Sequence, residues 1–479
     1  MRDEPPVPRP RLRLAFPTGR SKAWIAVVGV VFFVLGVLLN RLIVRLHQAN
    51  VQRRVVSRVR ELKGTVYYDC HYQPGGSEGQ LLDPDQWPEP AWLRDLLGED
   101  FLHDVFYVTF STFGSAGAGV MPYYQQQVTD DELEQLTGLP HLRWLALAGT
   151  RVTDAGMRHL AALPELEKLW LSYTAVSDAG IERLKVLGNL KCLMLDGTPV
   201  GDAAAAHLAT LRGLEVLSLT GTRVTDAGAK HLGQLTRLEI LFLAGTAVSD
   251  AGVESLKNDR NLKSLGLDGT SLSDAGIAQL RDLTNLEVLA LRGTSVSDLG
   301  LTHLARMSKL RTLLLQGSRA TLPGLIHLFT RLQGRSLEEA LDTTVENPAK
   351  RDEEQRVVSL DLSDLRVTDA GVARLREIES LQWLRLNRSE VSDAGLAHLE
   401  SLSNLTLLGL ANNPITDSGL KHLRGLRKLR TLHLEGTRVS REGIRELEKA
   451  MPESLRVYSS SAPGEGPAAE PAPKPTGPG

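Results

Sequence analysis

The sequence predicts an α/β solenoid, built from repeated units of one helix and one short strand, behind a single apolar helix long enough to span a membrane. Three observations predict this architecture. A four-residue pattern returns every 24 residues, leucine is abundant where aromatic residues are scarce, and an uncharged apolar run lies near the N-terminus. A repeat of this kind replaces the roughly three globular domains that 479 residues would otherwise suggest.

Composition narrows the class of protein. The chain has 85 Leu against 9 Phe, 8 Tyr and 6 Trp, and 71 of the Leu lie between Asp130 and Arg456, which favours stacked aliphatic ladders. Lys and Arg number 55 and Asp and Glu 57, so the net charge of −2 excludes a globally basic nucleic-acid binder. The two cysteines, Cys70 and Cys192, are too few for a disulfide framework or a Cys-based zinc site.

Residues 1–22 form a basic N-terminal tail, and residues 23–44 are predicted to form a transmembrane helix. Ala23 to Leu39 are 17 uncharged residues, and the apolar run resumes at Leu42. At about 1.5 Å per residue, this stretch reaches roughly 25–33 Å, enough for the hydrocarbon core. An uncleaved anchor is favoured over a cleaved signal peptide because no small-x-small exit follows the run. Five Lys or Arg residues lie within 20 residues on each side, so the orientation stays open.

Residues 45–104 are predicted to form a juxtamembrane helix and an N-terminal capping module. The apolar residues that share one face of this helix are Leu46, Val51, Val55 and Val59. The arginines around the other faces that could contact anionic lipid are Arg53, Arg54 and Arg58. A solvated stalk, in which these charges only maintain solubility, is the alternative. A strand over 64–69, a helix over 91–97 and a strand over 105–110 are expected to follow.

The repeat is visible in the tetrad Thr153-Asp154-Ala155-Gly156, which returns every 24 residues up to Ser297 and again from Thr368 to Thr416. With degenerate copies, thirteen units are visible. In each unit, apolar residues spaced by three and then by two predict a helix followed by a strand. The Ser or Thr before each Asp is predicted to be the helix N-cap, with the Asp stabilising the N-terminus of its own helix. The Gly-Thr pair after each strand predicts a tight turn.

The segment Leu214 to Ala229 (LEVLSLTGTRVTDAGA) resembles the leucine-rich repeat of the 24-residue, helix-backed kind, and the resemblance covers about 330 residues. It implies a right-handed horseshoe over residues 105–457, with parallel strands on the concave face and helices on the convex face. The pattern departs from the common consensus by placing Gly-Thr where that consensus has Asn. With the anchor and the segment Pro90 to Phe101, the chain also resembles bacterial single-pass membrane-anchored leucine-rich repeat proteins of unassigned function.

Two segments interrupt or follow the repeats. An insertion within 329–356 is charged and contains Pro348, and it is predicted to be an exposed loop with a short helix over 336–340. Residues 458–479 are rich in Pro, Gly and Ala, and a disordered tail is expected.

No motif predicts catalysis. The sequence has no nucleophile with a placed base, no H-E-x-x-H, no P-loop and no dinucleotide-binding glycine pattern. Seven histidines recur at one helical position, which duplication explains without a metal site, and the repeated aspartates are expected to stabilise helix N-termini rather than hold cations. We therefore expect no enzyme, no cofactor, no metal and no nucleic-acid partner.

The outward positions of the strands vary most and predict the function. On the concave face, the residues expected to bind a partner are Trp144, Trp170, Met194, Ile240, Phe242, Leu314, Trp383 and Arg385. Because isolated exposed apolar residues are also ordinary, the pattern alone does not prove an interface. The predicted function is the binding of a protein partner through this face. The alternatives are a structural element of the cell envelope without a specific ligand, or a substrate-receptor-like subunit of an enzyme complex.

Overall fold

The computed structural model describes residues 20–71, 91–110, 128–328, 350–351 and 357–460. The chain divides into two compact parts, Met1–Phe106 and Tyr107–Gly479, which we call unit 1 and unit 2. Without a number, a unit is one 24-residue repeat. The boundary that the sequence predicts between capping module and solenoid, after residue 104, lies two residues before the boundary between unit 1 and unit 2. The helix predicted over 336–340 and the tail from 461 onward lie outside the described residues.

Unit 1 begins with one continuous helix, α1 (Arg20–Glu61), which spans both the predicted transmembrane and juxtamembrane helices. Its segment Val28–Glu61 is long and apolar enough to cross a membrane. Large apolar side chains from Val30 to Leu39, such as Phe32 and Phe33, are exposed. The elements that follow are β1 (Thr65–Tyr68), η1 (Asp69–His71), α2 (Ala91–Leu97), α3 (Glu99–Leu102) and the start of β2 (Val105–Thr109).

The C-terminal half of α1 packs on α3 and β1 through a face that overlaps the predicted one in part. Of the predicted residues, Val55 and Val59 are buried and Val51 is half-buried, whereas Leu46 is exposed. Ala49, Gln52 and Val56 are buried as well, and with Val59 they are spaced by three and four along one helical stripe. The prediction from apolar residues alone missed Gln52, because its side chain is buried by hydrogen bonding to backbone groups around His103.

Unit 2 repeats one strand and one helix. The strands of its first sheet are the end of β2, β3 (Trp144–Ala146), β4 (Lys168–Trp170), β5 (Cys192–Met194), β6 (Val216–Ser218), β7 (Ile240–Phe242), β8 (Ser264–Gly266), β9 (Val288–Ala290) and β10 (Thr312–Leu314). The strands of its second sheet are β11 (Lys350–Arg351), β12 (Val357–Asp361), β13 (Trp383–Arg385), β14 (Leu407–Gly409), β15 (Thr431–His433) and β16 (Arg456–Tyr458). Tyr458 therefore still belongs to a strand, one residue beyond the predicted end of the solenoid.

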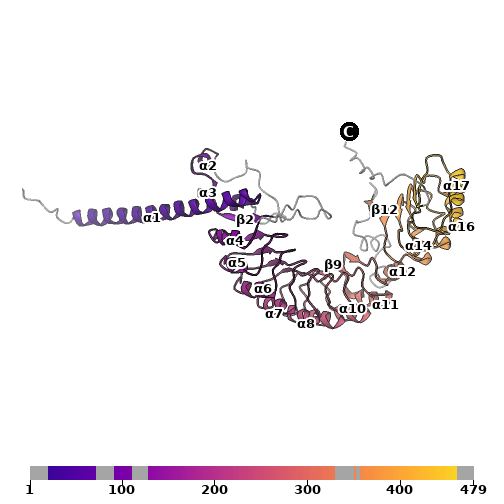
Figure 1. Ribbon diagram of the computed structural model, residues 1–479, viewed down its shortest axis with the longest axis horizontal. Helices are drawn as coiled ribbons and strands as arrows, with labels where there is room; N and C mark the ends of the chain where they lie inside the picture. Colours follow the sequence, from indigo (N-terminus) through magenta and orange to yellow (C-terminus); the bar gives the residue numbers. More distant parts are fainter. Residues whose placement is uncertain (1–19, 72–90, 111–127, 329–349, 352–356, 461–479) are drawn as a thin grey trace, which may run out of the picture. The chain divides into compact units, whose positions relative to one another are not determined.

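The helices of unit 2 follow the same order. Those before the insertion are α4 (Asp130–Leu136), α5 (Met157–Leu160), α6 (Asp178–Leu184), α7 (Asp202–Leu208), α8 (Asp226–Leu232), α9 (Asp250–Val253), η3 (Glu254–Leu256), α10 (Asp274–Leu280), α11 (Asp298–Thr302), η4 (His303–Arg306) and α12 (Leu322–Ile326). Those after it are α14 (Asp369–Leu375), α15 (Asp393–Ala397), α16 (Asp417–Leu420), η6 (Lys421–Gly425) and α17 (Arg441–Ala450). Within unit 2, the helices line one side and the strands the other (Figure 1).

The strands pair in parallel and in register, apart from the antiparallel pair β11–β12. Leu145 pairs with Leu169, and Leu193 with Leu217, so one leucine of each strand stacks on the leucine 24 residues away. These leucines are fully buried. Burial of one Leu side chain contributes about 1.5–3 kcal/mol, so the stacked column is a main source of stability for a domain without one central core. Parallel strands, backing helices and the repeating leucines confirm the predicted solenoid.

The turns and caps follow the repeat. The Thr225 hydroxyl accepts a hydrogen bond from the backbone N–H of Ala227 at 3.2 Å, which confirms the predicted N-cap. In the Gly-Thr turn, Gly245 has φ +64°, and the Thr246 hydroxyl donates to the Leu243 carbonyl at 2.6 Å. The backbone N–H of Thr246 donates to the same carbonyl at 3.3 Å, so the buried Thr closes the turn with two hydrogen bonds. In the one unit with the Asn of the common consensus, Asn413 instead donates to the carbonyls of Leu386 and Leu410.

The repeated aspartates do more than the sequence predicted. Asp202 lies in the first turn of α7, yet its carboxylate accepts hydrogen bonds from the backbone N–H and the hydroxyl of Thr225, the N-cap of α8. The same contact joins Asp226 to Ser249 and recurs along both parts of the solenoid. Asp202 and Asp226 each lie in the first turn of their own helix, as predicted, but the prediction missed that their carboxylates also reach the next repeat. We call this contact the inter-repeat clasp.

The insertion separates the helix and the strand of one enlarged unit. Helix α12 packs on α14, and the backbone N–H of Gly317 donates to the Asp364 carbonyl at 2.8 Å, so the units on either side of the insertion are neighbours. Leu322 occupies the position of the clasp aspartate, and the would-be Cβ of Gly371 meets its side chain at 3.2 Å. The clasp therefore stops at the point where the described strands divide into two sheets.

Candidate functional site

The outward side chains of the first strands of unit 2 form a cluster that we call the aromatic patch: Tyr107, Trp144, Lys168, Trp170 and Met194. Parallel register places Trp144 between Tyr107 and Lys168. The same register places Trp170 beside Met194 on the next strand. Adjacent strands are about 4.8 Å apart, so these side chains form one continuous surface rather than scattered residues.

Ring geometry shows that the aromatic patch is packed. The ring centroids of Tyr107 and Trp144 lie 5.8 Å apart in an edge-to-face arrangement, and those of Tyr107 and Trp170 lie 6.2 Å apart. The Lys168 Nζ lies 4.1 Å from the centroid of the Trp144 ring, a cation–π contact. Trp144, Lys168 and Trp170 are each half-buried. The patch therefore offers ordered apolar area and one positive charge, the features that enrich protein interfaces.

A second apolar pair lies two strands further on. Ile240 and Phe242 are the two outward residues of β7, and both are half-buried. Phe242 pairs in register with Gly266, and a Cβ at Gly266 would stand 2.6 Å from the Phe242 ring. The missing side chain at Gly266 thus leaves the space in which the Phe242 ring lies.

A hydrogen-bonded network borders the aromatic patch. The Asp196 carboxylate accepts hydrogen bonds from the hydroxyls of Ser172 and Ser218, and from the backbone N–H of Thr220 at 3.1 Å. Ser172 and Asp196 belong to consecutive repeats, and Ser218 and Thr220 both belong to the next one, so the network cross-links three neighbouring repeats. Its donors are satisfied within the chain, so it supports the face without needing a ligand.

The second sheet presents polar groups instead. Trp383 and Tyr458 are exceptions, with 39% and 45% of their surface exposed, and Trp383 pairs in register with Ser359 and Leu407. Arg385 forms an ion pair with Asp361 at 3.6 Å. A hollow of about 320 Å³ lies beside this pair, and its lining is made by Asp361, Ser363, Arg385, Asn387, Arg388, Ala411, Asn412, His433 and Glu435.

Charge pairing at the polar hollow is already satisfied in part. The hydrogen bond from Arg388 lowers the pKa of Asp364, and the same contact raises the pKa of Arg388. At the far edge of the hollow, His433 stacks on Tyr458 with ring centroids 4.8 Å apart. These contacts make the hollow a charged surface with internal pairs, unlike the aromatic patch.

Not every predicted site residue takes part. Trp144, Trp170 and Met194 come together in the aromatic patch, Ile240 and Phe242 form a separate pair, and Trp383 and Arg385 lie on the second sheet. Leu314 is buried, with 8% of its surface exposed, so the expectation that it offers area to a partner was wrong. The repeat pattern could not predict this burial, because it places Leu314 on the outward side of its strand but does not tell what covers that side.

Tyr107 was missed. It lies 37 residues before Trp144, so the 24-residue period does not reach it. The alternation in Val105 to Phe110 was the available signal, because a strand places Tyr107 opposite the buried Phe106 and Val108.

On the described part of the strand face, no group of metal ligands is found. Within the described residues, the group of three or more His, Cys, Asp or Glu side chains that could hold a metal ion lies in unit 1. In the repeated histidine column, His422 pairs with Glu400 at 2.6 Å on the helix side.

Comparisons agree with this architecture. Residues 401–423 match the leucine-rich repeat family model. Together with the stacked 24-residue units of helix and strand, this match makes the chain a leucine-rich repeat protein. Among curated proteins, none matches the chain.

Several solved structures are similar. An internalin of Listeria monocytogenes is 19% identical over 70% of this chain and 89% of its own, with a TM-score of 0.38. A leucine-rich repeat protein of Leptospira interrogans is 17% identical over 68% of this chain and 80% of its own, with a TM-score of 0.44. The leucine-rich repeat ectodomain of the Arabidopsis receptor kinase HAESA, solved with a peptide hormone, is 17% identical over 86% of this chain and 77% of its own, with a TM-score of 0.41.

Proposed function

We propose that this protein is a membrane-anchored binding protein, without catalysis of its own, that holds a protein partner on the strand face of unit 2. Leucine-rich repeat domains typically serve as scaffolds for protein–protein interaction. The observation that supports the proposal is the aromatic patch, where two Trp residues, a Tyr and a Met stand side by side on consecutive strands. Trp and Tyr dominate the energetics of protein interfaces because they bury large area at low entropic cost.

The proposed anchor is the segment 23–44 within α1. Contact of anionic lipid with Arg53, Arg54 and Arg58 stays a prediction. Arg53 lies 3.5 Å from Asp100 and Arg58 lies 3.0 Å from Glu61, so both would have to exchange an acidic partner for a headgroup. Arg54 is exposed. Protease accessibility of the repeats in intact cells would determine the side of the membrane on which a partner must be sought.

A photo-crosslinking amino acid placed in cells tests the proposed face. We would introduce it at Lys168, inside the aromatic patch, and at Leu299, which is 65% exposed on helix α11. Crosslinking of a discrete protein from position 168 and not from position 299 is expected. The combined substitution W144A and W170A in the chain that carries the crosslinker should abolish that adduct.

The control is V186A, which removes apolar area from a side chain that is 63% exposed and lies outside the strand face. This variant should keep the adduct, and circular dichroism should show all variants folded. If the two positions crosslink alike, or if W144A with W170A leaves the adduct unchanged, the strand face is not the binding surface. The domain would then fit a structural element of the envelope better.

A further inference from the structure

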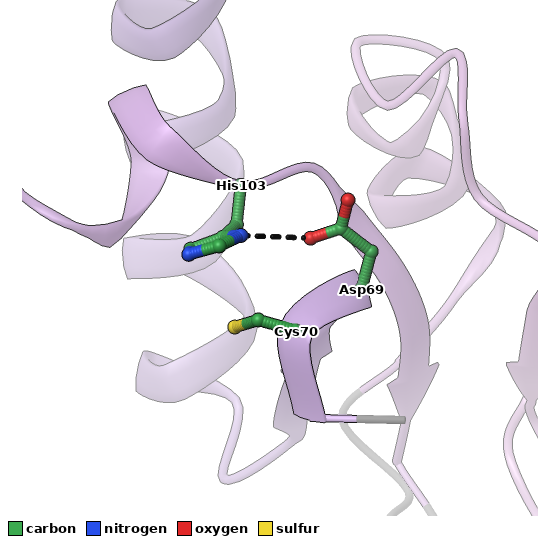
Figure 2. A group of neighbouring side chains, drawn as sticks. All are labelled: Asp69, Cys70 and His103. Atoms are coloured by element: carbon green, nitrogen blue, oxygen red, sulfur yellow. Dashed lines mark hydrogen bonds and ion pairs between the residues drawn. The ribbon is translucent and has the colours of Figure 1, made fainter. Parts of the chain in front are cut away.

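Three side chains with different metal-ligand atoms meet in unit 1 (Figure 2). Asp69 and Cys70 belong to η1, directly after β1, and His103 lies between α3 and β2. The Nδ1 atom of His103 lies 3.1 Å from Oδ1 of Asp69. One carboxylate oxygen, one sulfur and one imidazole nitrogen all lie within 4.8 Å of one another. His103, which follows Cys70 by 33 positions, thus meets the adjacent pair Asp69 and Cys70.

The backbone around this group is fixed from several sides. The backbone N–H of Asp69 donates to the Asp104 carbonyl at 3.0 Å, which ties η1 to the segment that carries His103. The Gln52 side chain of α1 donates to the His103 carbonyl at 2.9 Å and accepts from the backbone N–H of Val105 at 3.3 Å. Gln52 is itself buried. A site held by hydrogen bonds from separate elements keeps its ligands in place before an ion binds.

The burial of the three side chains fits a site that is closed on one side. Cys70 and His103 are buried, whereas 57% of the Asp69 side chain is exposed. An ion could therefore enter past Asp69 and meet the sulfur and the imidazole inside. Burial also shields the ion from competing water, which strengthens its attraction to a thiolate and a carboxylate.

The mixture of ligand atoms selects the kind of metal. Ca²⁺ and Mg²⁺ prefer oxygen ligands throughout, whereas a thiolate together with an imidazole suits Zn²⁺. Zn²⁺ binds nitrogen and oxygen at about 2.0–2.2 Å and sulfur at about 2.3 Å, so its tetrahedral ligands stand roughly 3.3–3.8 Å apart. The separations in this group come within reach of those values after small side-chain adjustments. The sequence-based expectation of no zinc site considered cysteine-based sites, and a mixed site needs only one cysteine.

We propose that Asp69, Cys70 and His103 form a binding site for Zn²⁺. On binding, the Cys70 thiol gives its proton to solvent, and the thiolate, the His103 imidazole and the Asp69 carboxylate become ligands. Three protein ligands leave one tetrahedral position for water or a further ligand. The site adds a metal link between η1 and the α3–β2 connection, which the hydrogen bond from the Asp69 backbone N–H to the Asp104 carbonyl already joins.

Cobalt titration of the purified full-length chain in detergent tests the proposal, because Co²⁺ occupies zinc sites and reports a thiolate ligand by its charge-transfer absorption. We expect one equivalent of Co²⁺ to give this absorption and one equivalent of Zn²⁺ to remove it. The absorption should be absent in C70S and kept in C192S, which changes the other buried cysteine. D69N, a near-isosteric change at an exposed side chain, should weaken Co²⁺ binding by at least about tenfold while the chain stays folded.

Thermal unfolding gives a second measurement that does not depend on colour. Zn²⁺ should raise the Tm of the wild-type chain and of C192S, and at the same concentration it should raise the Tm of D69N less. The proposal is overturned if Co²⁺ gives no thiolate absorption with folded wild-type protein, if C70S keeps that absorption, or if C192S loses it. Equal metal affinity in wild type and D69N would remove Asp69 from the site.

Discussion

The Asp202 carboxylate, in the first turn of α7, accepts two hydrogen bonds of 2.7 Å from Thr225, one from its backbone N–H and one from its hydroxyl. Thr225 in turn caps the next helix through Ala227. One side chain therefore anchors the residue that starts the following unit. In a solenoid, where each unit contacts only its neighbours, such a contact converts the stability of single units into cooperativity between them.

Removal of the clasp should weaken the junction between α7 and α8. D202A leaves the backbone N–H of Thr225 without its charged acceptor, and also that of Gly228, which lies 2.9 Å from the same carboxylate. Loss of hydrogen bonds to a charged group costs about 1.5–3 kcal/mol. We expect faster hydrogen exchange at Thr225 and Gly228 and a lower urea midpoint. D282A is the control, because the ion pairs of Asp282 are exposed. Equal effects of both variants would contradict a special role for the clasp.

The glycine of the repeated tetrad is required by the same contact. A Cβ at Gly228 would collide with Oδ1 of Asp202 and stand 2.9 Å from a Val224 methyl group. Helix propensity alone would make G228A stabilising by about 1 kcal/mol, so the collision reverses the sign. We expect G228A to lower the Tm by several degrees. G188A, at a glycine with nothing within 4 Å of its would-be Cβ, should leave the Tm almost unchanged. A stabilised G228A would show that the units can shift apart without cost.

The sequence could predict the repeating unit but not the contacts between units. The fixed 24-residue period placed Leu145 on Leu169, and the Ser or Thr at the N-cap is a local preference that one unit reveals. Asp202 contacts Thr225, which lies 23 residues later. The role of Thr225 as an N-cap already explained why a Thr stands there. The preference for Asp in the first turn of a helix therefore explained the residue without its contact to the next repeat. Because the repeats share one residue pattern, the sequence does not tell which repeat a side chain contacts.

The Gly-Thr turn sets a second, purely local demand. Gly245 has φ +64°, where a side chain is strained, and Asn412, which occupies the matching position in a later unit, has φ +57°. Asn tolerates this left-handed conformation better than β-branched residues. We expect G245V to cost about 1–2 kcal/mol of unfolding free energy and G245N clearly less, measured by urea denaturation of the two variants side by side. A Cβ at position 245 would lie 3.8 Å from the Cα of Gly221. If both variants cost the same, crowding against Gly221 limits this position rather than backbone strain.

The candidate site was predictable where it follows the ladder. Trp144 and Trp170 occupy outward positions of consecutive units, so the period alone makes them neighbours on the strand face. Tyr107 precedes the regular repeats, and Leu314 lies where the first sheet ends, and both differ from expectation for that reason. Edges of a repeat lose the translational symmetry on which such predictions depend.

The insertion should divide the stability of unit 2. Leu322 replaces the clasp aspartate at this junction, and β10 and β12 belong to different sheets. Fewer bonds between neighbours lower the cooperativity of a one-dimensional array. In hydrogen-exchange mass spectrometry under mild urea, we expect residues 357–460 to open as a block separate from residues 128–328. Uniform exchange of both parts in one transition would show that packing of α12 on α14 compensates for the missing contacts.

Asp259 occupies a core position that is Leu in neighbouring units, such as Leu235 and Leu283, and it is buried with 5% of its surface exposed. Burial raises its pKa from 3.8 to about 6, a difference that corresponds to about 3 kcal/mol. A raised pKa means that the folded state holds the proton more tightly, so this contribution to stability is full below about pH 4 and lost as the pH rises through 6.

D259L should therefore stabilise the chain at pH 7.5 by up to about 3 kcal/mol, and the gain should shrink at pH 4.5. D259N, which removes the titration but keeps a polar group, should show a flatter pH dependence than wild type and a smaller gain than D259L. A gain from D259L that is independent of pH would assign the effect to packing alone, and not to the charge.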